Sequence, residues 1–250
     1  MTEEMKIEDY LAQGGKLTSP GNVPSRYRAE LLKLMATFVD SELAGAAGFA
    51  DTINDAPGIK PRIAAAKIVA EKTDNAGKVL RLMGDFGADT NRYATHHPWA
   101  ARLDRDADIG TQRSEHDMRL AVFNYPLNGW VDSVVMNLLM GEAVGVQLDD
   151  MTKLSYQPLA EAFREIKPVE QRHTELAAEG LAEMDDMADA QASVDYWWPR
   201  VASSFGGADT ARDETLRNWG LRHGSSADMR SAWETRAAKA LDAAGLSKPA

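Results

Sequence analysis

The sequence contains no cysteine. This absence excludes disulfides, thiolate nucleophiles, and zinc or iron–sulfur sites that depend on cysteine ligands. Any bound metal would have to be held by carboxylates and imidazoles. Such ligands favour hard or borderline cations such as iron or manganese.

Long hydrophobic runs are also missing. No segment offers about 18 uninterrupted apolar residues, which is roughly the length needed to cross a bilayer as a helix. The first ten residues, MTEEMKIEDY, are charged and lack the apolar centre of a signal peptide. We therefore expect a cytoplasmic protein with no membrane partner.

Positive charge is scarce relative to negative charge. The chain has 28 Lys and Arg residues against 38 Asp and Glu residues, which gives a formal net charge of -10. Binding to a phosphate backbone requires a basic face, and the basic residues here are scattered among acids. We expect no nucleic-acid partner, and we interpret the excess negative charge as serving solubility.

Alternation of polar and apolar residues is almost absent, so a strand-rich fold is not expected. Helical spacing of apolar residues dominates instead. It predicts four long helices over residues 26–49, 61–87, 129–147 and 156–184, followed by shorter helices around Trp197, Trp219 and Trp233. The prediction is an all-α bundle of four long helices with additional C-terminal helices.

The first 25 residues differ from the rest of the chain. They are polar and contain Gly14, Gly15, Pro20 and Pro24. We predict a flexible N-terminal arm over residues 1–25 and a single helical domain over residues 26–250, because 250 residues with 44% hydrophobic content suffice for one large core.

The motif EQRH is the strongest chemical signal. Glu170 and His173 lie three positions apart in a predicted helix, so they occupy the same helix face. Di-iron carboxylate bundles use this ExxH motif on two helices and one further carboxylate on each of the other two. Glu42 continues the apolar stripe of the first helix, and Glu142 is the candidate carboxylate of the third helix.

The second predicted helix lacks an ExxH motif. In the stretch TDNAGKVL the template falls on Asn75 and Lys78. An amide is a weak metal ligand, and a protonated lysine is not a ligand at all. The sequence therefore predicts that two irons are hard to hold.

Six stretches resemble one known family, and they follow one another in the order found in that family. They are SELAG (41–45), AAKIVAEKTDNAGKVL (65–80), VFNYPLNGWVD (122–132), LSYQPLAEAF (154–163), EQRH (170–173) and YWWPRVASSFG (196–206). Together they resemble the A chain of bacterial phenylacetyl-CoA epoxidase, a ferritin-like di-iron oxygenase component of phenylacetate catabolism. The resemblance extends over roughly residues 25 to 235.

The resemblance implies a ferritin-like four-helix bundle with a defined activity. The family's subunit binds an aromatic acyl-CoA thioester, holds two irons, and inserts one oxygen atom into the ring. It works with a related subunit that lacks iron and with a reductase. Glu42 would match the first-helix ligand, and Glu170 with His173 the fourth-helix pair. The third-helix acid aligns with Gly141, which leaves Glu142 about 100° round the helix from the ideal direction.

These departures favour a divergent family member whose di-iron site is degenerate and depleted of metal. Without cations, burial and mutual repulsion would raise the pKa of at least one of Glu42 and Glu170. We predict that the ammonium of Lys78 lies between them, as charged side chains replace metal in the family's iron-free subunit. The candidate functional residues are thus Glu42, Glu170, His173 and Lys78.

An active oxygenase subunit is the alternative, hydroxylating or epoxidising an aromatic acyl-CoA with one or two irons at low occupancy. Glu42, Glu170 and His173 could form a facial triad for one ferrous ion. Glu71 and Asp74 lie close enough on the second helix to help, and with two ions Glu142 would be a further ligand. A carboxylate-rich metal store is a third alternative, weakened by the lost second-helix ligands.

The sequence also allows expectations about partners. A homodimer formed through helix faces is expected. The resemblance implies two further partners, a reductase and a related bundle subunit. Arg26, Arg28 and Lys33 are candidate contacts for a CoA phosphate, although ordinary surface charge explains them equally well.

Overall fold

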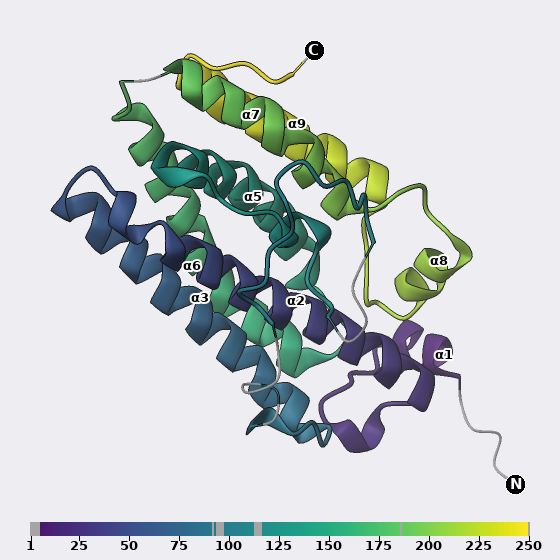
Figure 1. Ribbon diagram of the computed structural model, residues 1–250. Helices are drawn as coiled ribbons and strands as arrows, with labels where there is room; N and C mark the ends of the chain where they lie inside the picture. The colour runs from purple at the N-terminus through teal and green to yellow at the C-terminus, as the bar shows by residue number, and fades with distance from the viewer. Residues whose placement is uncertain (1–5, 92, 94–97, 113–116, 186, 250) are drawn as a thin grey trace, which may run out of the picture.

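The computed structural model describes residues 6–91, 93, 98–112, 117–185 and 187–249 (Figure 1). Within these residues every regular element is a helix, and the single β-bridge, between Leu17 and Tyr156, is isolated. The prediction of an all-α protein is therefore confirmed.

Four long helices form the bundle. They are α2 (Ser25–Asp51), α3 (Ile59–Asp85), α5 (Gly129–Met151) and α6 (Gln157–Ala182). Helices α2 and α3 pack against each other, α5 and α6 form a second pair, and α3 also packs against α6 (Figure 1). This arrangement fits the predicted ferritin-like four-helix bundle. Helix α6 contains Pro168 and continues past it to Ala182.

The remaining helices surround this bundle. Helices α7 (Met187–Ala202) and α9 (Ser226–Ala243) lie along the side of α5 that faces away from α2 and α3 (Figure 1). The short helices α1 (Ile7–Ala12) and α8 (Ala211–Asn218) lie at one end. In the described ranges, 3-10 turns lie at Pro20–Asn22, Ile53–Asp55, Ala121–Asn124 (η3) and Ser203–Phe205 (η4).

Helix α5 is apolar on almost every side because it is enclosed by α6, α7 and α9. Its length and composition would allow it to cross a membrane, but 72% of its most apolar window is buried inside the protein. A core helix has the same composition. Trp233 of α9 fixes the contact by donating a hydrogen bond from its indole nitrogen to the carbonyl oxygen of Leu139, at 3.0 Å.

Part of the N-terminal arm is attached to the bundle. Leu17 is buried, and its carbonyl oxygen accepts a hydrogen bond from the backbone nitrogen of Gln157 at 2.9 Å. Glu8 accepts a second bond, from the indole nitrogen of Trp219. The flexibility predicted for residues 1–25 stays a prediction, and residues 1–5 lie outside the described residues.

Two arginines, Arg119, which is buried, and Arg102, which is half-buried, hold the described part of the excursion between α3 and α5. Arg119 forms an ion pair with Asp117 and donates hydrogen bonds to three carbonyl oxygens of the segment 98–101. Arg102 donates to the carbonyl oxygen of Ala44 on α2 at 2.8 Å. The neighbouring η3 turn packs against α2, where the backbone nitrogen of Leu120 donates a hydrogen bond to Ser41 at 3.0 Å, and Leu120 and Phe123 form part of one wall of the candidate site.

Candidate functional site

A cluster of buried polar side chains lies in the interior of the bundle. Glu42 comes from α2, Lys72 and Asn75 come from α3, and Glu170 and His173 come from α6. Each of the five is less than 9% exposed. Since buried charges are stable only when paired, the hydrogen bonds among these groups decide what the site can hold.

Lys72 is the centre of the cluster. Its ammonium nitrogen lies 2.8 Å from Glu170 Oε2 and 3.3 Å from Glu42 Oε1, and it donates a hydrogen bond to each. Asn75, one turn further along α3, donates from Nδ2 to the other oxygen of Glu170 at 2.9 Å. Three helices are thereby joined through one carboxylate–ammonium–carboxylate bridge.

His173 extends the cluster toward the surface. Its Nε2 lies at hydrogen-bond distance, 2.8 Å, from Oε2 of Glu71, and its Nδ1 lies 3.4 Å from Glu170 Oε1. The Glu71 side chain is 33% exposed and also pairs with Lys67 at 3.6 Å. The imidazole therefore stands between one buried and one partly solvated carboxylate.

The pKa values in the cluster are pushed apart. Burial raises the pKa of Glu42, the negative charge of Glu170 raises it further, and Lys72 offsets only part of this rise. Burial would also raise the pKa of Glu170, but Lys72 and His173 outweigh it and lower that pKa. Burial would lower the pKa of Lys72, but Glu170 and Glu42 outweigh it, so the pKa of Lys72 is raised.

The prediction for Lys78 is wrong. Lys78 pairs with Asp74 on its own helix at 3.2 Å, and the side chains of the pair are 23% and 63% exposed. Lys72 takes the place between the carboxylates that the sequence template gives to Lys78. Six residues separate the two lysines, so they point about 120° apart around the helix. The ExxH template therefore falls one turn too late, at Asn75 and Lys78 instead of Lys72 and Asn75.

The buried stripe of α3 contains the signal that identifies Lys72. It consists of Ala65, Ile68, Lys72, Asn75, Ala76, Val79 and Met83. Lys72 falls on this helical spacing and Lys78 does not. A lysine on an apolar stripe requires a buried partner, and that requirement is visible in the sequence.

Glu142 is not part of the cluster. It is half-buried in a separate groove with Asp149, Lys167 and Arg236, and none of the described hydrogen bonds or ion pairs joins it to Glu42, Glu170 or His173. Burial raises the pKa of Glu142, and Arg236 offsets only part of the rise.

Gly141 takes the position on α5 that faces the cluster. It lines a small cavity of about 40 Å³ together with Lys72 and Glu170. A Cβ atom at this position would lie 2.4 Å from Oγ1 of Thr174 on α6. A carboxylate could not replace Gly141 without moving the side chain of Thr174.

A larger cavity of about 230 Å³ adjoins the other side of the cluster. Glu42 contributes to its wall, and Oε2 of Glu42 is buried without a hydrogen-bond partner among the described residues. The remaining wall is mainly apolar and includes Phe38, Leu120, Phe123, Met140, Val144 and Phe205. The cavity thus has a mainly apolar wall with a few polar side chains, of which Glu42 is shared with the cluster.

The side chains of the cluster determine whether a metal ion could be coordinated there. In the described part of the chain, no group of three or more His, Asp or Glu side chains is arranged to hold a metal ion. Glu42, Glu170 and His173 come together as predicted, but the Lys72 ammonium lies against both carboxylates. An ammonium group is a donor with no lone pair to offer a cation.

Replacing Lys72 should be far more costly than replacing Lys78. Lys72→Met leaves Glu170 buried without its cation, so we expect the free energy of unfolding to fall by about 3 to 5 kcal/mol. Lys78→Met removes only an exposed pair and should cost less than about 1 kcal/mol. Urea unfolding of the two variants measures both values, and equal losses would contradict the assignment of Lys72.

Glu42 should make stability depend on pH. Its folded pKa lies above the ordinary value of 4.5, so the folded state holds the proton more tightly and loses stability as pH rises from about 4.5 toward the raised pKa. Glu42→Gln cannot ionise. The difference in free energy of unfolding between this variant and the unsubstituted protein should therefore shift in favour of the variant by at least about 1 kcal/mol when the pH is raised from 5 to 8. Urea unfolding at both pH values tests this, and an unchanged difference would contradict a raised pKa.

Comparison with known proteins agrees with this architecture. The family described as "Phenylacetic acid catabolic protein" matches residues 14–250. A similar protein of Escherichia coli (strain K12), the A chain of 1,2-phenylacetyl-CoA epoxidase, is 24% identical over 257 residues, which cover 100% of this chain and 78% of the relative. Because the family match takes in nearly the whole sequence, the chain belongs to the phenylacetic acid catabolic protein family.

Proposed function

We propose that this chain is a metal-free bundle subunit of phenylacetate catabolism that binds an aromatic acyl-CoA thioester or a related aromatic acid. The observation that carries the proposal is the position of the Lys72 ammonium, 2.8 Å from Glu170 and 3.3 Å from Glu42. The family and the name of the E. coli relative supply the substrate class.

The residues present do not fit a di-iron centre. Two cations about 3.5 to 4 Å apart need several carboxylates to neutralise them and imidazoles to complete their coordination. Lys72 and Asn75 occupy the α3 face where an ExxH motif would supply ligands, and Gly141 offers no side chain on α5. One ammonium charge supplies part of the positive charge that the carboxylates would otherwise lack.

A single ferrous ion held by Glu42, Glu170 and His173 fits poorly for the same reason. The ion would have to displace Lys72 from Glu170 and bear the repulsion of the ammonium if it stayed nearby. His173 already shares its Nε2 with Glu71. The alternative of an active iron oxygenase therefore requires rearrangement of α3 side chains, and measured iron content distinguishes it from the metal-free subunit.

The 230 Å³ cavity is the proposed site for the acyl part of the ligand. Mainly apolar and aromatic walls with a small number of polar groups are typical of small-molecule sites. A groove of about 510 Å³ adjoins it, since both are lined by Leu34, Thr37, Leu216 and Leu221.

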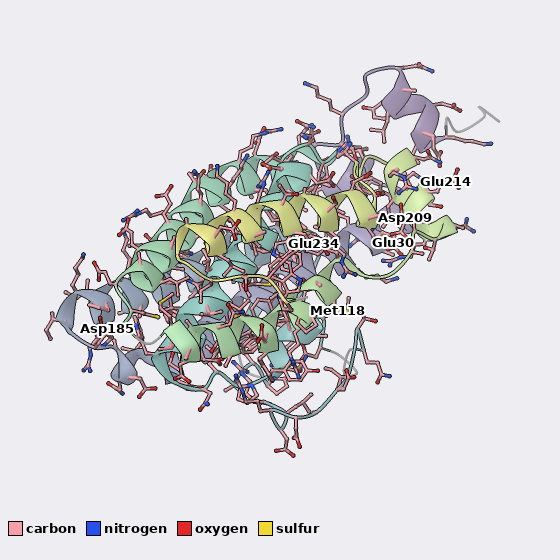
Figure 2. The ribbon with its side chains drawn as sticks, turned by 90° about the horizontal axis from the view of Figure 1, so that it is seen from above. Glu30, Met118, Asp185, Asp209, Glu214 and Glu234 are labelled. Carbon is pink, nitrogen blue, oxygen red and sulfur yellow. The ribbon has the colours of Figure 1, made fainter. Side chains whose placement is uncertain are left out.

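Two basic side chains line this groove. Lys33 and Arg212 line it, and both pair with Glu30. Figure 2 shows Glu30 at the end of the molecule where α8 lies. In the proposal this groove binds the anionic part of the thioester. Lys33 and Arg212 would then give up their contacts with Glu30 and contact a phosphate group instead.

Iron content tests the metal-free assignment. Protein expressed with added iron should contain less than about 0.1 iron per chain, because an ammonium is no ligand. The double substitution Lys72→Glu and Asn75→His rebuilds an ExxH face on α3 and should raise the iron content at least severalfold, measured by elemental analysis. The surface substitution Lys78→Glu is the matched control and should change nothing. Stoichiometric iron in the unsubstituted protein would reject the proposal.

Cavity filling tests the binding site. Val144→Trp should lower the affinity for phenylacetyl-CoA by at least about tenfold, because a bulky side chain leaves too little room for the ring. Leu176→Trp enlarges a side chain in a separate cavity between α3, α5 and α6 and serves as the control. Isothermal titration calorimetry at one protein concentration measures both. Equal affinities in the two variants, or no binding to the unsubstituted protein, would contradict this site.

A further inference from the structure

The outer face of α3 exposes two large apolar side chains. Ile59 is 74% exposed and Ile63 is 63% exposed, and they lie one turn apart on the same side of the helix. Only two other large hydrophobic residues of the described chain, Tyr10 and Leu103, are exposed, and at 38% and 39% they are much better covered. Exposed isoleucines on adjacent turns are typical of a surface that a partner covers.

The two isoleucines begin a regular stripe, which we name the outer α3 stripe. It consists of Ile59, Ile63, Ala66, Ala70, Thr73 and Gly77. The spacing of four and three residues is the spacing of helices that pack along their length. All six positions fall within an arc of about 80°, opposite the face of α3 that carries Lys72 and Asn75.

Gly77 supports a close approach from outside. A glycine inside a helix costs roughly 0.5 to 1 kcal/mol relative to alanine, so it calls for a reason. A Cβ atom at Gly77 would meet only the tip of Arg81, at 4.0 Å, so packing within the chain does not require glycine there. A second helix lying against the stripe would require a small residue at this position.

We propose that the outer α3 stripes of two copies of this chain pack against each other, antiparallel, about a twofold axis near Ala70. A twofold interface needs a surface that complements itself. The stripe meets this condition, because its large residues lie before Ala70 and its smallest residue lies after it. Antiparallel pairing places Ile63 of one copy over Gly77 of the other.

Charge selects the same direction. Residues 59–69 contain Lys60, Arg62 and Lys67 and no acidic residue. All the carboxylates of α3 follow Ala70, at Glu71, Asp74 and Asp85, together with the surface cations Lys78 and Arg81. A parallel pair would set three cations against three cations. An antiparallel pair leaves only Lys60 and Arg62 near cations, Lys78 and Arg81, and it brings Lys67, which is 60% exposed, toward the 63% exposed Asp74.

Sedimentation velocity tests the interface. The unsubstituted protein should be a dimer at micromolar concentration, and the double substitution Ile59→Glu and Ile63→Glu should weaken dimerisation at least 100-fold. Both side chains are exposed, so folding should be unaffected, and circular dichroism checks this. Leu103→Glu is the matched control and should remain dimeric. A monomeric unsubstituted protein, or a dimer that the double substitution leaves intact, would overturn the proposal.

Cross-linking tests the direction of the helices. The chain has no cysteine, so a single introduced cysteine gives an unambiguous signal. Ala70→Cys lies near the proposed axis and should form disulfide-linked dimers on mild oxidation. Ile59→Cys should not, because antiparallel pairing separates the two copies of residue 59 by about 33 Å. Cross-linking at residue 59, or none at residue 70, would contradict the antiparallel arrangement.

Discussion

The Lys72 ammonium, held between two buried carboxylates, is the interaction around which the bundle interior is organised. It joins α2, α3 and α6 through Glu42 and Glu170. Each of these charges would be costly to bury alone, and removing one member leaves the others uncompensated. A bundle that places acidic residues in its interior needs a cation there. In this chain the cation is a side chain, so its position is fixed by the fold itself.

The cavities on the two sides of this lysine and its carboxyl partners differ in size. The small cavity on one side, of about 40 Å³, is lined by Gly141, whereas the cavity on the other side has about 230 Å³. Glu42 lies between the bridge and this larger cavity. In the proposed function, these helices hold a binding site for an apolar molecule beside a centre that carries a lysine instead of a metal ion.

Much of the fold could be predicted because helical periodicity is a local property of the sequence. The apolar spacing predicts the first long helix over residues 26–49, and α2 is found at Ser25–Asp51. The cluster was harder, because the ExxH template is placed by motif alignment and falls on Asn75 and Lys78. The apolar stripe of α3, which depends only on helical spacing, distinguishes Lys72 from Lys78. On α5 the resemblance aligns the acid with Gly141, and the structure places Gly141, and not Glu142, beside Lys72 and Glu170.

The enclosure of α5 has a consequence for how the chain reaches this structure during synthesis. Helix α5 is made before α7 and α9, which later cover one side of it. Until those helices emerge from the ribosome, an apolar helix of 23 residues must exist half-covered. A partly synthesised chain is therefore most prone to aggregation, or to capture by chaperones, in the interval between the completion of α6 and the arrival of Trp233.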